Sequence, residues 1–189
     1  MGKESLTNKG KMNKFTKTLI KIVAGYLCFI IILYVIFQKV LMLSLIPSSS
    51  MADTLLPGDL IISTRYDIGM EDIDRYDILI FTLPDEPEQE YIKRVIGLPG
   101  ETIEIRTNGK VYADDVELDD AFIKEPMEWY DNDNTYVVPE GCYFFLGDNR
   151  NHSEDSRYWG KYVPVENVLA KEKFIIIRLS DFGYKGNES

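Results

Sequence analysis

The sequence predicts a mainly β protein, in which an antiparallel β-sheet domain follows one N-terminal transmembrane helix. Two observations predict this fold class. The first is an uncharged stretch from Ile22 to Gln38, near the start of a 189-residue chain. The second is a series of short β-branched and aromatic runs, bounded by turn residues, in the rest of the chain. About 145 residues follow the helix, which is enough for one domain with its own core.

The predicted helix covers residues 19–46. At a rise of ~1.5 Å per residue it is about 40 Å long, close to the thickness of a bilayer with its headgroups. The first 21 residues hold six lysines and one glutamate, whereas residues 40–189 hold 14 basic against 30 acidic residues. Short basic flanks stay in the cytoplasm. We therefore expect a basic cytoplasmic tail (residues 1–18), a single pass through the cell membrane, and an extracytoplasmic β-rich domain (residues 47–182).

A cleaved signal peptide is the alternative for the apolar stretch, since it also has a basic start and an apolar centre. We favour the membrane span because the run exceeds a usual signal-peptide core and no Ala-x-Ala site follows it. Membrane lipid is thus an expected partner. The acidic domain argues against nucleic acid as a partner. The sequence does not specify an oligomeric state.

The cysteines and the histidine exclude two kinds of site. Cys28 lies in the apolar stretch and Cys142 in the following domain, so a disulfide between them is sterically implausible. His152 is the only histidine, and no Cys-x-x-Cys occurs, so a zinc site has too few ligands. We expect no metal and no other cofactor.

The elements predicted after the helix are strands. Leu60–Ile62 follows the turn residues Pro57-Gly58-Asp59, and similar runs are Ile78–Phe81, Tyr91–Ile96 and Phe174–Ile177. The last of these is expected to be a core strand.

Two hairpins are expected between these strands. Thr102–Arg106 and Lys110–Tyr112 flank an Asn108-Gly109 pair, which is a strong hairpin signal. Val137-Val138 and Tyr143–Leu146 repeat the pattern around a Pro-Glu-Gly turn.

The remaining polar segments are expected to be irregular. Asp85–Glu90 is predicted to be an acidic loop and Trp129–Asn134 a second loop. Residues 183–189 are expected to form a flexible C-terminal tail.

A serine and a lysine carry the chemistry that the sequence suggests. Ser50 ends a serine cluster that begins at Ser48, just after the predicted membrane span. A serine hydroxyl needs a nearby base, and a lysine serves if burial makes it neutral. In a strand, Lys93 shares a face with Tyr91 and Val95, which makes an apolar setting plausible. The alternative is that Lys93 is a solvated strand lysine.

Several motif blocks occur in one order along the chain. They are Pro47-Ser48-Ser49-Ser50-Met51 with Thr54-Leu55 and Pro57-Gly58-Asp59, Arg75-Tyr76-Asp77-Ile78-Leu79-Ile80-Phe81, Tyr91-Ile92-Lys93-Arg94-Val95-Ile96-Gly97-Leu98-Pro99-Gly100, Gly147-Asp148-Asn149-Arg150, and Ser153 with Asp155-Ser156-Arg157-Tyr158-Trp159-Gly160. In content and order they resemble the motifs of bacterial type I signal peptidases (leader peptidases), serine peptidases with a Ser-Lys dyad. The single N-terminal anchor resembles the Gram-positive form.

The resemblance implies a role for each matching residue. Ser50 would be the nucleophile and Lys93 the general base of peptide hydrolysis through an acyl-enzyme. The hydroxyl of Ser48 and the backbone N–H of Ser50 would form the oxyanion hole, since acyl transfer needs donors aimed at the developing charge. Ser153 matches the position that hydrogen-bonds the lysine and orients it.

The resemblance also implies supporting residues and a substrate. Asp155 and Arg157 match a salt-bridge pair that supports the site, with Asp148 close by. The substrates would be secreted preproteins that carry signal peptides, whose extended segments bind by adding a strand to a sheet edge. Shallow apolar pockets select small side chains in that family. The candidate pocket residues in this chain are Met51, Leu55 and Ile92.

Each matching residue also has a plainer interpretation. Ser48 is a linker serine in that case, and Asp148-Asn149-Arg150 is a turn after a strand. Asp155 and Arg157 would then form an exposed pair of small energetic value. His152 adjoins Ser153, but we expect it to be a bystander.

The chain departs from the family pattern near both catalytic segments. Asp53 stands where proline is frequent, and Tyr76 replaces a common glycine. Neither change removes a catalytic group, so the substrate choice is affected more than the reaction.

Other functions fit less well. A non-catalytic structural or pilus-assembly relative would be expected to lack Ser50 or Lys93, and both are present. A self-cleaving repressor with a Ser-Lys pair would carry a DNA-binding module, which an acidic extracytoplasmic domain does not resemble. A penicillin-binding enzyme is excluded because no Ser-x-x-Lys or Lys-Thr-Gly motif occurs.

Overall fold

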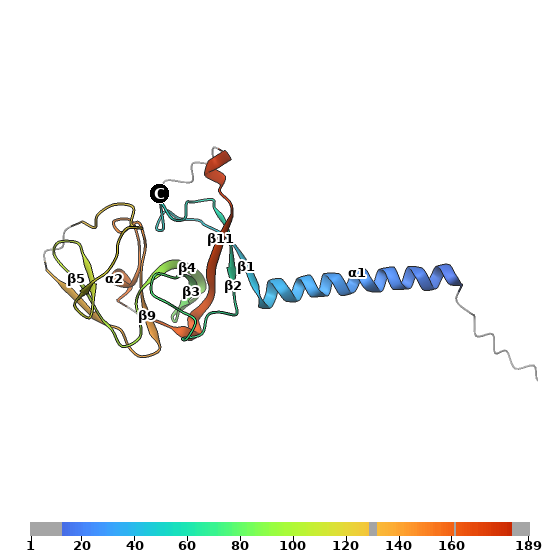
Figure 1. Ribbon diagram of the computed structural model, residues 1–189, viewed down its shortest axis with the longest axis horizontal. Helices are drawn as coiled ribbons and strands as arrows, with labels where there is room; N and C mark the ends of the chain where they lie inside the picture. Colours follow the sequence, from blue (N-terminus) through green and yellow to red (C-terminus); the bar gives the residue numbers. More distant parts are fainter. Residues whose placement is uncertain (1–12, 129–131, 161, 183–189) are drawn as a thin grey trace, which may run out of the picture. The chain divides into compact units, whose positions relative to one another are not determined.

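The computed structural model describes residues 13–128, 132–160 and 162–182. The chain divides into two compact units, Met1–Gln38 and Lys39–Ser189. The first contains helix α1 (Lys14–Lys39) except its last residue, and the second, called the sheet unit below, contains all of the strands in the described ranges (Figure 1). The predicted mainly β, antiparallel class is confirmed. Most of the predicted tail 1–18, and all of the tail 183–189, lie outside the described residues.

Helix α1 is long and apolar enough to cross a membrane. Its N-terminus is capped by Asn13, whose side-chain oxygen accepts the backbone N–H of Thr16 at 2.7 Å. None of its residues is buried, and the mean hydropathy of its most apolar 18-residue window is 2.6. The helix ends at Lys39 rather than at the predicted residue 46, because the next residues pair as a strand with a later segment.

The larger sheet is antiparallel throughout and has the strand order β1-β2-β11-β3-β4-β9-β10. Its strands are β1 (Leu41–Leu45), β2 (Leu60–Thr64), β3 (Ile78–Leu83), β4 (Glu86–Gly97), β9 (Cys142–Leu146), β10 (Val163–Pro164) and β11 (Val168–Ile177). The central strands β3 and β4 lie side by side, with β11 next to β3 and β9 next to β4. The short helices α2 (Ser156–Trp159), η1 (Val165–Asn167) and η2 (Leu179–Phe182) connect or follow these strands.

A smaller antiparallel sheet has the order β7-β6-β5-β8. Its strands are β5 (Thr102–Ile105), β6 (Val111–Ala113), β7 (Val116–Glu117) and β8 (Asn134–Val137). The predicted hairpin at Asn108-Gly109 is confirmed, since β5 pairs with β6 and Gly109 has a φ of 76°. Glycine adopts this left-handed conformation without the steric penalty of a Cβ atom.

The second predicted hairpin is wrong. Val137 lies in β8, which pairs with β5 of the smaller sheet, whereas Tyr143–Leu146 lies in β9, which pairs with β4 of the larger sheet. The turn at residues 139–141 therefore joins two sheets. Local turn residues do not decide which strand a neighbouring run will pair with.

The acidic segment 85–90 is not a loop. Glu86–Glu90 forms the first part of β4 and pairs with the end of β3 after a two-residue turn. The glutamates are exposed, so a strand leaves their charges in water. Only part of the predicted loop at Trp129–Asn134 can be compared, because residues 129–131 lie outside the described ranges and Asn134 begins β8.

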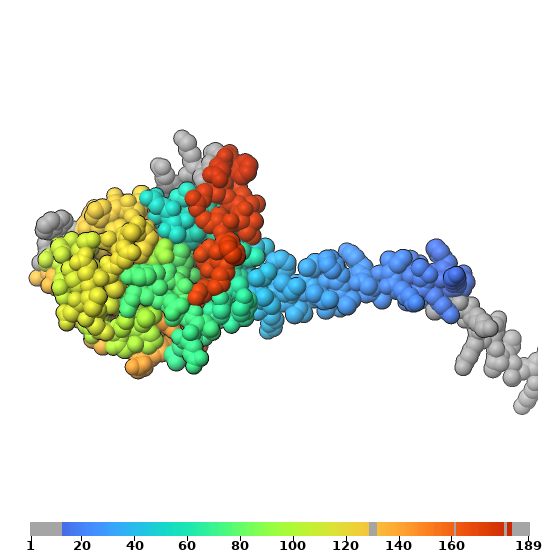
Figure 2. Space-filling view, in the orientation of Figure 1, coloured from blue at the N-terminus to red at the C-terminus, as the bar shows by residue number. Residues whose placement is uncertain are grey.

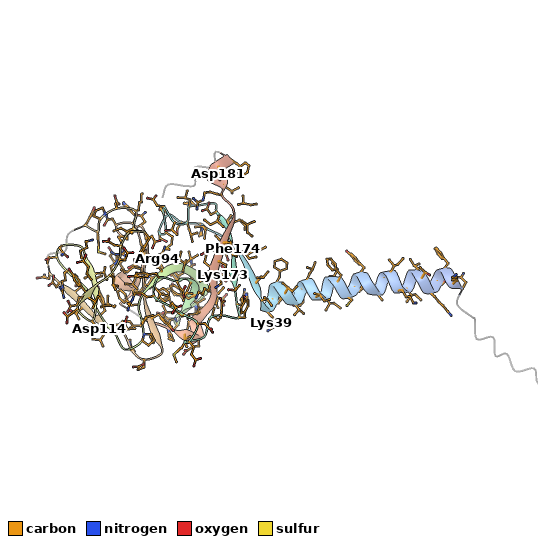
Figure 3. The ribbon with its side chains drawn as sticks, in the orientation of Figure 1. Lys39, Arg94, Asp114, Lys173, Phe174 and Asp181 are labelled. Atoms are coloured by element: carbon orange, nitrogen blue, oxygen red, sulfur yellow. The ribbon has the colours of Figure 1, made fainter. Side chains whose placement is uncertain are left out.

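The run Phe174–Ile177 is a strand, but its prediction as a core strand is wrong. Phe174 is 70% exposed and Ile176 is 49% exposed. The buried residues of β11, Val168 and Ala170, lie at its beginning, which pairs with β3, whereas its end pairs with β2 alone. Figure 2 shows this red C-terminal segment on the surface of the sheet unit, and Figure 3 labels Phe174 beside Lys173.

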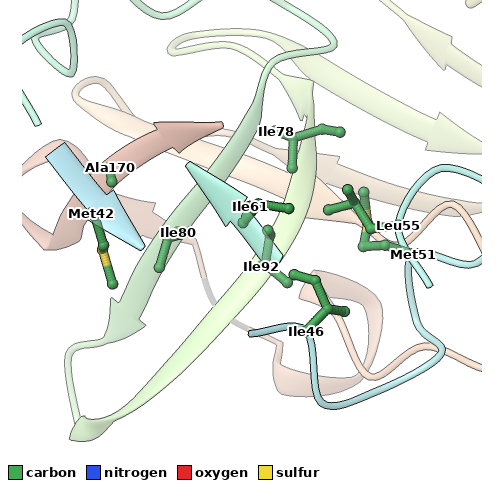
Figure 4. Packing of buried hydrophobic residues seen from close by; sticks show 9 residues of the cluster. All are labelled: Met42, Ile46, Met51, Leu55, Ile61, Ile78, Ile80, Ile92 and Ala170. Atoms are coloured by element: carbon green, nitrogen blue, oxygen red, sulfur yellow. The ribbon is translucent and has the colours of Figure 1, made fainter. Parts of the chain in front are cut away.

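One of the apolar clusters in the sheet unit lies beneath the serine turn. It joins the turn between β1 and β2 to the larger sheet, and Figure 4 shows Met51 and Leu55 side by side within it. Its buried members are Met42, Ile46, Met51, Leu55, Ile61, Ile78, Ile80, Ile92 and Ala170. This packing fixes the serine turn against the strand that carries Lys93.

Asp53 has a left-handed backbone, with a φ of 72°. Proline, which is frequent at this place in the family that the sequence resembles, has its φ fixed near −65°. The turn after Ser50 thus differs from a turn that contains proline. We expect Asp53→Gly to raise the free energy of unfolding by at most about 1 kcal/mol, since glycine relieves the left-handed strain. Asp53→Pro should lower it by more, and urea unfolding measures both changes.

Tyr76 provides the contrast for this prediction. Its φ is 75°, but its ring packs on Phe122 with 5.4 Å between centroids, and its hydroxyl accepts the N–H of Asp119 at 3.1 Å. Glycine at Tyr76 would lose these contacts, so Tyr76→Gly should destabilise the protein. Stabilisation by both glycine variants would contradict this account.

Candidate active site

Ser50 lies in a tight turn between β1 and β2. The base of the loop is closed by two backbone hydrogen bonds, from Ile46 N–H to the Asp59 carbonyl at 2.9 Å and from Gly58 N–H to the Ile46 carbonyl at 2.8 Å. Within the turn, Leu55 N–H donates to the Met51 carbonyl at 2.7 Å. Met51 and Leu55 are fully buried below, which leaves the Ser50 hydroxyl to face Lys93.

A second segment holds the main chain of the serine turn. The backbone N–H of Asn149 donates to the Ser50 carbonyl, and its side-chain amide donates to the Ser49 carbonyl, both at 3.0 Å. The block 147–150 therefore holds the serine turn by hydrogen bonds, so the interpretation of residues 148–150 as only a turn after a strand is wrong. Asn149 was not among the residues expected to support the site, although it lies inside a recognised motif block.

Lys93 extends from β4 to the serine. Its Nζ donates to Ser50 Oγ at 2.7 Å and to the Ile92 carbonyl at 3.1 Å. The residue is 4% exposed, so the alternative of a solvated strand lysine is wrong. Burial lowers the pKa of Lys93 to about 8, against the smaller opposing effect of the carboxylates of Asp155, Glu154 and Asp148. At neutral pH roughly a tenth of the molecules then carry the neutral amine.

Ser48 lies at the open side of the same turn. Its hydroxyl is 3.3 Å from Ser50 Oγ, and the residue is exposed. A donor at this distance from the serine can reach an oxygen that develops negative charge beside it.

Ser153 is near the site but does not hold the lysine. It is buried, and its hydroxyl has no hydrogen-bond partner among the described residues. The expected hydrogen bond to Lys93 is therefore absent here. Its position is set by Gly147, because a Cβ atom there would lie 2.1 Å from Ser153 Oγ and 2.5 Å from the Ser50 carbonyl oxygen. Only a glycine lets the two serine segments approach so closely.

Asp155 and Arg157 form a buried pair. Arg157 Nε donates to one carboxylate oxygen at 2.7 Å and its Nη2 to the other at 2.8 Å, and the two side chains are 0% and 3% exposed. The same carboxylate accepts the N–H of Gly147 at 3.0 Å and caps helix α2. The interpretation as an exposed pair of small value is wrong. Asp155 thus ties helix α2 to the block that holds Ser50.

Asp148 is bound by an arginine that the sequence did not single out. Arg94, the residue after Lys93, donates from Nε at 2.8 Å and from Nη2 at 2.5 Å to the two oxygens of the Asp148 carboxylate. Thr54 Oγ1 also donates to this carboxylate at 2.5 Å. The Asp148 carboxylate therefore links the block 147–150 to the lysine strand by an ion pair and to the serine turn by a hydrogen bond. A sequence signal was present, because Arg94 directly follows Lys93 in the motif block that begins at Tyr91.

The dyad opens into a cleft of about 540 Å³. One wall is the segment 44–50, from the end of β1 to the serine turn, the other is the β4 segment 89–93, and Ile80, His152 and Glu154 complete it. Of the three candidate pocket residues, only Ile92 lines this cleft. Met51 and Leu55 are 0% and 1% exposed and belong to the core beneath the serine turn.

The chain is similar to known signal peptidases. A family model described as "Signal peptidase, peptidase S26" matches residues 17–177. A probable signal peptidase I-1 of Synechocystis sp. is 36% identical over 149 residues, which cover 75% of this chain and 74% of that protein. Signal peptidase I of Rickettsia prowazekii is 33% identical over 184 residues, 69% of each chain. A crystal structure of a signal peptidase I from Enterococcus faecalis is 35% identical and covers 56% of this chain and 97% of that one, with a TM-score of 0.43.

Proposed function

The chain belongs to the signal peptidase family S26, serine endopeptidases that remove signal peptides, and from this premise we propose that it cleaves preproteins with a Ser50-Lys93 dyad. The observation that carries the proposal is the 2.7 Å hydrogen bond between Lys93 Nζ and Ser50 Oγ, made by a lysine that is 4% exposed. A buried lysine is partly neutral, and a neutral amine in contact with a hydroxyl acts as its base.

The proposed reaction has two steps. Neutral Lys93 takes the hydroxyl proton as Ser50 Oγ attacks the scissile carbonyl, and the resulting ammonium protonates the leaving amine. Lys93 then takes a proton from the water that attacks the acyl-enzyme, and returns it to Ser50 Oγ as the ester bond breaks and the signal peptide is released. In both steps the carbonyl oxygen becomes negative beside the Ser50 N–H and the Ser48 hydroxyl, which stabilise it by hydrogen bonds.

The proposed substrate is the extended end of a signal peptide, bound as a strand in the cleft between segments 44–50 and 89–93. Helix α1 is proposed to anchor the enzyme with its N-terminus in the cytoplasm, as the basic flank favours. Enzyme and substrate then share the plane of the membrane, which raises their effective concentration.

The orientation is tested by adding protease to spheroplasts, which should digest the sheet unit. Its protection would contradict this orientation.

A cleavage assay tests the proposed function. A labelled preprotein with an Ala-x-Ala site is incubated with the detergent-solubilised wild type and with Ser50→Ala. Cleavage at that site by the wild type alone supports the proposal. The absence of cleavage by folded wild-type protein would count against it.

The rate should depend on pH through Lys93. Because its pKa is lowered to about 8, kcat/KM should rise about tenfold per pH unit up to about pH 8 and be level above it. The measurement is the pH profile of peptide cleavage under kcat/KM conditions. A profile already level above pH 7 would indicate an imidazole base instead, and a rise that continues to pH 10 would indicate a solvated lysine.

Removal of the Ser48 hydroxyl should weaken the stabilisation of the negative charge that develops on the carbonyl oxygen in the transition state. We expect Ser48→Ala to lower kcat by about 10²–10³-fold with little change in KM, as for other oxyanion-hole donors. Ser49→Ala is the matched control, because Asn149 binds its carbonyl and the substitution keeps that group. An equal loss in the two variants would contradict the assignment to Ser48.

A further inference from the structure

The active-site cleft carries negative charge at its rim. Of the described residues that line it, Glu90 and Glu154 are exposed carboxylates, and the one lysine is the buried Lys93. No ion pair joins either glutamate to a described lysine or arginine. The two charges therefore face whatever peptide occupies the cleft.

The two glutamates lie at different places along the cleft. Glu90 belongs to β4 and precedes Lys93 by three residues, which corresponds to about 10 Å along a strand. Glu154 follows Ser153 and lies close enough to Lys93 and Tyr91 for its charge to raise the pKa of both groups. Glu154 also lines the same cleft as Tyr91 and Lys93. A substrate strand in the cleft would pass both charges within a few residues of the scissile bond.

We propose that Glu90 and Glu154 make the enzyme select substrates with basic side chains close to the cleavage site and reject substrates with acidic ones. The inference rests on the proposed function and adds a charge preference to it. Glu154 would act on residues next to the scissile bond, and Glu90 on a residue about three positions away. Unit charges a few ångströms apart near a protein surface change binding several-fold to more than tenfold.

The test uses peptides with one Ala-x-Ala site. They differ only in a Lys, Gln or Glu placed in turn at each of the three positions on either side of the cleaved bond, except the two alanines. The measured quantity is the ratio of kcat/KM for the Lys peptide to that for the Glu peptide. We expect a ratio of about ten or more at one or two positions in low salt. It should fall towards one in 1 M salt, where the Debye length is about 3 Å.

The variants assign the effect to residues. Glu90→Gln and Glu154→Gln should each reduce the ratio at different positions, and the double variant should bring it within about twofold of one. Glu71→Gln is the matched control, since Glu71 is exposed and does not line the cleft. It should leave the ratio unchanged.

The outcomes separate this inference from the proposed function. Equal cleavage of Lys and Glu peptides, with normal cleavage of the Gln peptide, would overturn the charge preference and leave the peptidase intact. A ratio that survives in the double variant would overturn the role of the two glutamates. Folded protein that cleaves none of the peptides would overturn the proposed function and this inference with it.

Discussion

Lys93→Met is expected to abolish cleavage and to stabilise the fold. Methionine fills a similar volume without an amine, so Ser50 loses its base, and kcat should fall by roughly 10⁴–10⁶-fold, as when other nucleophile–base pairs are broken. His152→Ala should keep most of the activity, because His152 lines the cleft but makes no hydrogen bond to the side chain of Ser50 or Lys93. Cleavage of the labelled preprotein measures both effects.

The stability of Lys93→Met distinguishes the loss of the base from a loss of the fold as the cause of inactivity. The pKa of Lys93 is about 8 in the folded protein, against the ordinary lysine value of 10.5 that applies to the unfolded chain, so between these values the unfolded chain binds more protons. Stability therefore rises with pH through this window, and below pH 8 the folded protein carries the full penalty, up to about 3 kcal/mol. Lys93→Met removes the penalty.

Thermal unfolding at two pH values tests this argument. The midpoint of Lys93→Met should exceed that of the wild type at pH 7, and the difference should shrink at pH 10. A less stable, inactive Lys93→Met would show that the lysine is needed for the fold, and an active one would exclude the lysine base.

Among the single variants proposed here, Asp148→Ala is expected to lower the free energy of unfolding most, by about 3–5 kcal/mol. It leaves Arg94, whose side chain is 10% exposed, as a buried charge without its carboxylate. Activity should fall as well, because Asp148 joins the lysine strand to the serine turn through Arg94 and Thr54. Urea unfolding measures the change in stability.

Two controls define the mechanism of this loss. Glu104→Ala breaks the more exposed pair with Arg106, in which the arginine and glutamate side chains are 33% and 30% exposed, and should cost much less. The double variant Arg94→Met, Asp148→Leu should recover much of the stability, because two apolar residues replace the buried pair. If Glu104→Ala and Asp148→Ala were equally destabilising, burial would not explain the effect.

The sequence predicted the elements that depend on residues close together in the chain, such as tight turns and apolar stretches. The Asn108-Gly109 turn supplies its own left-handed residue, so its hairpin follows from the sequence. The apolar stretch at Ile22–Gln38 likewise predicts a helix of membrane-spanning length. The order of the motif blocks predicted Ser50 and Lys93 as a pair, and the structure places Lys93 Nζ 2.7 Å from Ser50 Oγ.

The sequence thus determined the fold class, the apolar helix and the residues of the candidate dyad, because these depend on composition, periodicity and short motifs. Only the tertiary structure decided pairing and burial, which depend on contacts between distant segments. It ended helix α1 at Lys39, made Glu86–Glu90 a strand, and exposed Phe174. It also placed Arg94 on Asp148 and left the Ser153 hydroxyl without a partner among the described residues. No local pattern contains those contacts, because each joins segments that meet only when the sheet has formed.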